Sequence, residues 1–244
     1  MIFLSYINIR TLIVLVVSLL SCFLAIHFDI KIHFNTFLFG LAIAFPLGTS
    51  IQTAFKRREK ALEYLSLFKA GMSAIHYSLQ SSGKLDPAKK LEAITMLSDA
   101  ADRLLHQLKV SDGTMLDFQQ EAGKIMFFME TNRNNISSRT FTRVIRYMKD
   151  SLDGATYLLS LTRHRTVPGL RFYSLFFINV FAILNAPMLV YELGQQLPEW
   201  TIYLASSFGS ILLITLYNFQ EQIEFPFDQK GADDIKLEDF RLNI

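Results

Sequence analysis

Five residues between positions 41 and 56 recur at steps of four, four, three and four, which places them on one face of a helix. Their character changes along the chain from apolar to polar to cationic: Leu41, Phe45, Thr49, Gln52 and Lys56. A hydroxyl and amide face is costly against lipid but favourable against water. We interpret this face as the lining of a water-filled ion path whose apolar end acts as a dewetting gate.

A simpler explanation of the same residues is a helix that leaves the bilayer, because polar side chains are expected near the membrane surface. The sequence alone leaves both interpretations open. The pore interpretation also requires several copies of the chain. One chain has four candidate membrane spans, and four helices do not easily enclose an ion path. A lining helix therefore requires a ring of subunits.

Residue types that carry catalysis are scattered. The five histidines share no motif, and no HExxH, GxSxG, phosphate loop or dinucleotide fingerprint occurs. The one cysteine, Cys22, lies inside an apolar run, so an internal disulfide is excluded. We expect no enzymatic activity and no bound cofactor.

The composition indicates a chain that is part membrane and part aqueous. Of the 244 residues 51% are hydrophobic and 19% are charged, and the mean hydropathy is +0.28. A helix needs about 20 apolar residues to cross the hydrocarbon core. Four segments are long enough: Thr11 to Phe28, Phe34 to Phe55, Leu170 to Leu193 and Glu199 to Phe219.

The distribution of charge predicts the orientation of these spans. Residues 56 to 171 hold 19 of the 24 Lys and Arg but 12 of the 22 Asp and Glu. This block should stay in the cytoplasm under the positive-inside rule, which also puts both termini there. A cleaved signal peptide is the alternative for the first segment. We favour a retained hairpin in a bacterial inner membrane, because a second span follows almost at once.

The block between the second and third spans is predicted to be helical throughout, with Asp86 as a helix cap before Pro87. Its basic residues alternate with acidic ones, which is typical of solvated helix faces, so we expect no nucleic-acid partner. The predicted division is a first helix pair at 1–55, a cytoplasmic helical region at 56–169, a second helix pair at 170–219 and a cytoplasmic C-terminal segment at 220–244.

Three stretches in this order resemble the bestrophin family of membrane ion channels. "GLAIAFPLGTSIQTAFKRREKA" resembles the family's glycine-rich pore-lining helix, and "TYLLSLTRHRTVP" resembles the stretch before its third span. "IEFPFDQKGADDIKL", after the fourth span, resembles its segment with trailing acidic residues. The resemblance covers nearly the whole chain.

This resemblance implies an all-α membrane protein that assembles as a homopentamer around one axial pore. The family's neck residues correspond to Leu41, Phe45 and Thr49, and Gln52 and Lys56 would line the path further in. Small monovalent ions would be conducted. The basic residues 56–58 favour chloride or other anions, with cations as the alternative.

The last 24 residues carry apolar groups at intervals unsuited to disorder, so we expect them to dock on the cytoplasmic helices. Asp228, Asp233 and Asp234 are candidate Ca²⁺ ligands because they supply carboxylate oxygens. Residues 229–232 interrupt the acidic run of calcium-responsive family members, so we do not expect calcium gating. The functional alternative to a channel is a non-conducting membrane scaffold or sensor whose helical region binds a partner.

Overall fold

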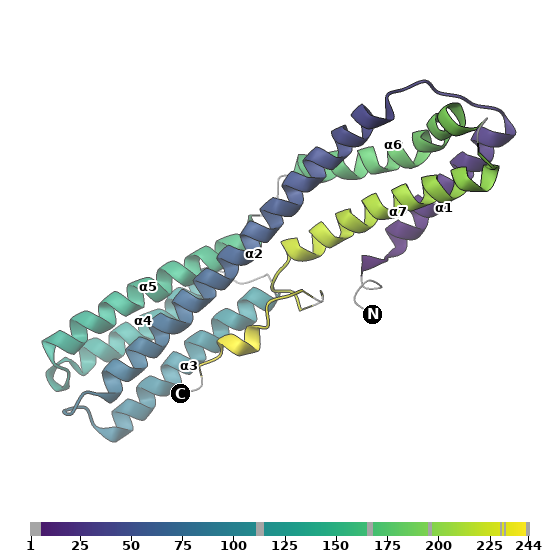
Figure 1. Cartoon of the computed structure of the whole chain (residues 1–244). Coiled ribbons are helices and arrows are strands. Elements are labelled where there is room, and N and C mark those ends of the chain that lie inside the picture. Colours follow the sequence, from purple (N-terminus) through teal and green to yellow (C-terminus); the bar gives the residue numbers. More distant parts are fainter. Residues whose placement is uncertain are drawn as a thin grey trace. The chain divides into compact units, whose positions relative to one another are not determined.

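The computed structural model describes residues 6–110, 115–164, 168–194, 197–229, 231 and 233–242. Within these ranges the regular structure is helical, as the sequence predicts (Figure 1). The 3-10 turns η2 (Arg133–Asn135) and η3 (Leu237–Phe240) accompany the α-helices. These helices are α1 (Ile9–His27), α2 (Thr36–Gln80), α3 (Pro87–Val110), α4 (Met115–Thr131), α5 (Ser138–Arg163), α6 (Pro168–Leu193) and α7 (Glu199–Glu224).

Four of the described helices, α1, α2, α6 and α7, are long and apolar enough to cross a membrane. The predicted spans lie within them, except for Phe28 after the end of α1 and residues 34 and 35 before the start of α2. The α2 helix has 45 residues, which at about 1.5 Å per residue is more than twice the thickness of a hydrocarbon core. Only part of α2 can therefore lie in lipid.

The chain forms two compact units. Unit 1 contains Met1–Lys56 and Thr166–Glu224, and unit 2 contains Arg57–Arg165 and Phe225–Ile244. The predicted divisions at 55/56, 169/170 and 219/220 lie one, four and five residues from these limits. The α2 helix contributes its first part to unit 1 and its second part to unit 2.

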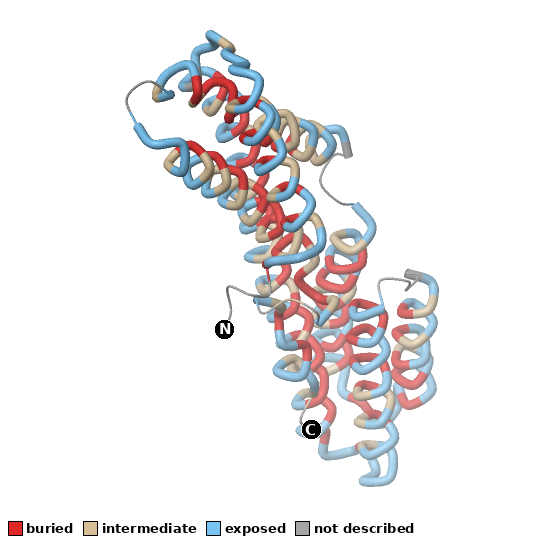
Figure 2. The backbone as a smooth tube through the Cα atoms, turned by 90° about the vertical axis from the view of Figure 1, so that its right-hand side faces the viewer, coloured by how far each residue is buried: buried red, intermediate tan, exposed pale blue. Residues whose placement is uncertain are grey.

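Unit 1 is a helical bundle in which α1, α6 and α7 pack on one another and on the first part of α2. Figure 2 shows buried residues along one side of these helices and exposed residues along the other. This one-sided burial follows the helical period of the apolar residues. The buried set includes Val14, Ile43, Leu47, Ile178, Ala182 and Ile214.

Small hydroxyl residues join α1 to α7 inside unit 1. The Ser18 and Ser206 hydroxyls lie 3.1 Å apart, and the Ser210 hydroxyl donates to Ser18 at 3.3 Å. All three side chains are buried. Small side chains let helices in a membrane approach closely, and hydrogen bonds between them add to the packing.

The proline within α6 is compensated by a neighbouring helix. Pro187 has no N–H, so the carbonyl of Ile183, four residues earlier, loses its partner within the helix. The Ser21 hydroxyl of α1 donates to that carbonyl at 2.5 Å. The freed backbone group is thus satisfied inside the bundle, as the low polarity of a membrane requires.

Unit 2 packs the second part of α2 with α3, α4 and α5. The predicted helix cap at Asp86 is confirmed, and Ser137 caps the start of α5. The Asp86 carboxylate accepts from the N–H of Ala88 at 3.2 Å, and the Ser137 hydroxyl accepts from the N–H of Thr140 at 3.1 Å. The core contains Leu65, Phe68, Met72, Leu97, Leu104, Phe118, Val144 and Leu158.

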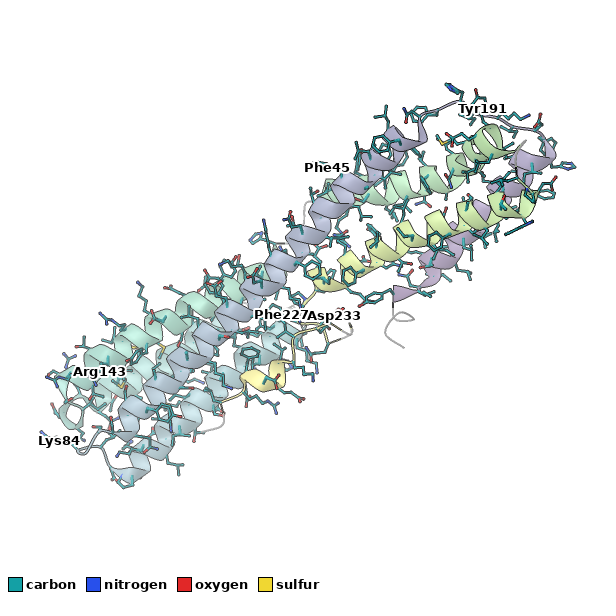
Figure 3. All side chains as sticks on the ribbon, viewed as in Figure 1. Phe45, Lys84, Arg143, Tyr191, Phe227 and Asp233 are labelled. Carbon is teal, nitrogen blue, oxygen red and sulfur yellow. The ribbon has the colours of Figure 1, made fainter. Side chains whose placement is uncertain are left out.

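The C-terminal segment is part of unit 2, so its predicted docking is confirmed. Phe227, Ile235 and Leu237 are buried in the same core (Figure 3 labels Phe227). The Lys69 ammonium donates to the carbonyl of Asp239 at 2.7 Å. Apolar anchoring is thus supplemented by a charged donor on a backbone carbonyl.

Candidate functional site

The face of α2 chosen from the sequence is exposed in unit 1. Leu41 is 51% exposed and Phe45, labelled in Figure 3, is 70% exposed. Thr49, Gln52 and Lys56 are exposed as well. The opposite face of the helix packs into unit 1 through Phe39, Ile43, Leu47, Ser50 and Ala54.

The polar residues on this face differ in how their hydrogen bonds are satisfied. The Thr49 hydroxyl donates to the carbonyl of Pro46 at 2.9 Å, and the Thr53 hydroxyl donates to the carbonyl of Thr49 at 2.8 Å. These threonines are satisfied by their own helix and tolerate lipid or water. Gln52 makes no hydrogen bond within the described part of the chain, so its exposed amide needs water or another molecule.

Exposed faces elsewhere in unit 1 have a different composition. Every exposed side chain of α1 between Leu12 and Leu24 is hydrocarbon, and so is every exposed side chain of α7 between Leu204 and Leu216. Such faces suit contact with lipid tails. The exposed face of α2 stands apart because Thr49, Gln52 and Thr53 interrupt its apolar character before Lys56.

Pro46 lies beside Phe45, within an α2 helix that continues through it. The proline leaves the carbonyl of Ala42 without its usual donor in the helix. The hydroxyl of Tyr173, on α6, donates to that carbonyl at 3.4 Å. Tyr173 was not identified from the sequence, and it carries no local signal, since its partner lies 131 positions away.

Removing this hydroxyl with Tyr173→Phe is expected to lower the stability of the protein by about 0.5–1.5 kcal/mol, the range for a neutral hydrogen bond. The readout is the apparent melting temperature in detergent. Tyr203→Phe is a matched control, because the Tyr203 hydroxyl has no hydrogen-bond partner in the described ranges. If the two variants melt at the same temperature, the hydrogen bond from Tyr173 to the carbonyl of Ala42 does not stabilise the protein.

Two of the three basic residues at 56–58 have structural partners. Arg57 donates to the carbonyls of His164 at 2.6 Å and Leu161 at 2.8 Å, which closes the end of α5. Arg58 donates to the carbonyl of Asp233 at 3.0 Å and so holds the C-terminal segment. The anion preference predicted from the sequence depended on all three charges. Lys56 is the exposed one of the three, and it has no such partner among the residues that the structure describes.

The candidate metal ligands lie in the docked segment, where Figure 3 labels Asp233. One oxygen of the Asp234 carboxylate accepts from the N–H of Gly231 at 3.0 Å. Among the residues that the structure describes, no three His, Cys, Asp or Glu side chains are grouped to hold an ion. The geometry therefore lends no support to a calcium site at Asp228, Asp233 and Asp234, which stays a prediction.

Two histidines near the first turn make aromatic contacts. His27 stacks on Phe23 with ring centroids 5.6 Å apart, and His33 meets the edge of Tyr191 at 5.0 Å. Such contacts suit packing beside interfacial aromatic side chains. They give these histidines a structural role without a ligand.

Comparison with known proteins gives a structural match. No protein-family model and no curated protein matches the sequence. A crystal structure of a variant bacterial bestrophin homologue from Klebsiella pneumoniae superposes with a TM-score of 0.81 at 17% identity, over 95% of this chain and 94% of that chain. The chain has a bestrophin-like fold. Another crystal structure of the Klebsiella pneumoniae homologue gives 0.79 at 16% identity, over 95% and 93%.

This bestrophin-like fold confirms, at the level of architecture, the resemblance drawn from the three sequence stretches. It also accounts for their order, with a helical region between two pairs of spans. With four helices able to cross a bilayer, the fold is that of a multi-pass membrane protein.

Proposed function

We propose that the protein is a homopentameric ion channel whose α2 helices surround one axial, water-filled pore. Leu41, Phe45 and Thr49 form the narrow neck, and Gln52 and Lys56 line the path beyond it. The bestrophin-like fold supports the architecture of the subunit. The number of subunits comes from the family resemblance.

The observation that carries the proposal is the exposed amide of Gln52, which has no hydrogen-bond partner in the described ranges, on a helix face that is apolar two and three turns earlier, at Phe45 and Leu41. An amide exposed to lipid tails costs several kcal/mol if it finds no partner. Against a water-filled path the cost disappears. The hydrocarbon faces of α1 and α7 are then the surfaces left for lipid.

A ring of subunits turns each neck residue into a circle of side chains. Leu41 and Phe45 present apolar rings that favour dewetting, and the Thr49 ring supplies hydroxyls below them. A wetted Thr49 ring shortens the apolar barrier to two rings. Small monovalent ions pass this neck down their gradients, and no bound cofactor takes part.

Anions such as chloride are the favoured substrates in this proposal, and cations are the alternative. In this proposal the protein lies in a bacterial inner membrane, with both chain termini and the cytoplasmic helical region on the cytoplasmic side. The partners of the chain are four further copies of itself, the lipid bilayer and the permeating ions.

Reconstitution of the purified protein into planar bilayers with unequal KCl on the two sides tests the proposal. We expect discrete single-channel currents whose reversal potential lies toward the chloride equilibrium potential. Native mass spectrometry in detergent should give five times the subunit mass. A monomer or dimer that passes no current would overturn the channel proposal.

The second candidate is a membrane scaffold or sensor. It is favoured by exposed apolar side chains on α3 and α4 of unit 2, which suit contact with a partner protein. Leu91, Leu116 and Phe127 are 65%, 66% and 75% exposed. In a pentamer, contacts between subunits can bury these three side chains. A native mass of five subunits therefore favours the channel, and a monomer or dimer favours the scaffold or sensor.

A further inference from the structure

The end of unit 1 that carries the turn between α1 and α2 contains a cavity of about 590 Å³, partly open to solvent. This volume falls within the range of about 300–1,000 Å³ that is usual for small-molecule sites. The described residues that line the cavity are His33, Phe34, Asn35, Phe37, Tyr191 and Glu192. Four aromatic rings and a carboxylate therefore meet at one place, and all of them belong to unit 1.

Hydrogen bonds hold the turn against α6 and so shape the cavity. The N–H of Ile32 donates to the carbonyl of Pro187 at 3.4 Å, one turn before Tyr191, which Figure 3 labels. His33, the next residue, meets the edge of the Tyr191 ring with centroids 5.0 Å apart. The side-chain oxygen of Asn35 accepts from a backbone N–H in the first turn of α2 at 3.1 Å. The lining residues from the turn and from α6 are thus positioned by contacts within the bundle.

The phenylalanine and tyrosine rings of the cavity remain accessible to a ligand. Phe34, Phe37 and Tyr191 are 52%, 75% and 50% exposed. The face of an aromatic ring is negative, so it attracts a cation that lies within about 6 Å of the ring centroid. Exposed aromatic side chains are also common at a membrane surface. Glu192 distinguishes this cavity, because it places a full negative charge beside the rings.

The charge balance at the cavity favours a cation. No lysine or arginine is among the described lining residues. Lys31, the basic residue of the turn, is paired with Asp29 at 2.7 Å. The amino end of α2 disfavours a cation and the carboxyl end of α6 favours one, so these two effects of similar size offset each other. The carboxylate of Glu192 then determines the sign of the ligand.

Glu192 also has an interaction within the chain. This interaction does not exhaust the carboxylate, which has two oxygens and about four acceptor sites. A quaternary ammonium group has no N–H to donate, so it needs only the negative charge and the ring faces. Quaternary ammonium groups are the ligands that aromatic cages typically recognise.

We propose that this cavity binds a substituted ammonium group, with the rings of Phe34, Phe37 and Tyr191 around the cation and Glu192 as its counter-charge. The open side of the cavity leaves room for the rest of the ligand. Because the cavity lies at the end of helices that can cross a membrane, the ammonium group can belong to a lipid headgroup or to a free amine.

The cavity adjoins the helix face that carries the candidate neck. Phe37, Leu41 and Phe45 follow at steps of four, so Phe37 lies on that face one turn before the neck. In the proposed channel, an ammonium group bound here lies at the entrance of the neck. This placement rests on the proposed function, whereas the binding itself does not.

The test measures the dissociation constant of choline for the full chain in maltoside detergent. Ligand-observed NMR at about pH 8, where free imidazole is uncharged, provides the readout. We expect millimolar binding, and much weaker binding of the uncharged choline analogue in which carbon replaces the nitrogen. Glu192→Gln should weaken choline binding about fivefold, the effect of one unit charge at about 4 Å in water. Tyr191→Leu should weaken it about two- to fivefold, the contribution of an exposed ring.

Matched controls come from the start of α7, at the same end of unit 1. Trp200→Leu removes an exposed ring and Glu199→Gln removes a carboxylate, and neither residue is among the described lining of the cavity. Both variants should keep the choline affinity of the original protein. Tyr191→Phe retains the ring and should keep it as well. All the changed side chains are exposed, so the variants should fold, and their melting temperatures in detergent check this.

Lipid nanodiscs distinguish the two sources of the ammonium group. In phosphatidylglycerol, which has no amine, choline should bind as it does in detergent. Loss of choline binding in phosphatidylcholine nanodiscs would show that a lipid headgroup fills the cavity. Binding that persists there would show that the cavity takes a free amine.

Unchanged choline affinity in Glu192→Gln and Tyr191→Leu would overturn this inference. Equal losses in the Trp200 and Glu199 controls would also overturn it, and so would equally tight binding of the uncharged analogue. The measurement needs no current, so it is independent of conduction. A protein that binds choline but does not conduct fails the channel proposal alone, and a conducting protein without choline binding fails this inference alone.

Discussion

Replacing Phe45 with alanine is expected to raise the single-channel conductance several-fold. Phe45 is 70% exposed in the single chain, on the face of α2 opposite its buried side. In a ring of copies its side chain narrows and dries the neck, and alanine both widens the opening and removes most of the apolar barrier to water. The measurement is the unitary current in planar bilayers in symmetric KCl.

Phe208→Ala is the matched control for this prediction. Phe208 on α7 is 65% exposed, within a face whose exposed residues are all hydrocarbon. The same truncation there should leave the unitary current unchanged, since this face suits lipid. Equal currents for the Phe45 variant and the original protein would place Phe45 outside the conducting path and return α2 to the interpretation of a helix leaving the bilayer.

Sequence periodicity predicted the elements that depend on short-range chemistry. The Asp86 cap before Pro87 and the face of α2 that repeats at steps of three and four both follow from residues within a few positions of one another. The docking of the C-terminal segment was also predicted, because Phe227, Ile235 and Leu237 are too apolar for a solvated tail.

Local sequence patterns could not predict contacts between segments that are distant in the chain. The sequence shows Arg57 and Arg58 only as charges after a span, whereas the structure gives them carbonyl acceptors at Leu161, His164 and Asp233. Long side chains of this kind choose partners by tertiary geometry, which no local pattern encodes.

The two prolines within spans show how the bundle supplies what a single helix lacks. Pro46 and Pro187 each free a carbonyl, at Ala42 and Ile183, and a hydroxyl from another helix reaches each one. In water such carbonyls would be solvated without cost. In a membrane the hydroxyls of Tyr173 and Ser21 substitute for water, so each proline is tolerated only with its partner helix in place.

A charged network joins three helices of unit 1 near the ends of the spans. One oxygen of Glu221 on α7 accepts from Arg10 of α1 at 2.6 Å, and the other accepts from Arg171 of α6 at 2.7 Å. Arg171 also lies 3.9 Å from a carboxylate oxygen of Glu224, whose side chain is fully buried. Glu221 is therefore the residue through which α1 and α6 are both tied to α7.

The variant Glu221→Gln is expected to destabilise the protein by about 2 kcal/mol. Each hydrogen bond to a charged group contributes about 1.5–3 kcal/mol when buried, and the Glu221 and Arg171 side chains, at 24% and 25% exposed, retain part of that value. The glutamine keeps the shape but leaves Arg171 facing Glu224 alone and Arg10 without its carboxylate. The apparent melting temperature in detergent should fall by roughly 4–8 °C.

Glu63→Gln provides the comparison that isolates burial from charge. Glu63 pairs with Lys60, and the two side chains are 58% and 51% exposed. Loss of this pair should lower the free energy of unfolding by less than about 0.5 kcal/mol. Both variants remove one negative charge and one ion-pair acceptor from a helix. If they melt at the same temperature, Glu221 contributes no more than a surface pair, and the packing of α1, α6 and α7 must rest on their apolar and small-residue contacts alone.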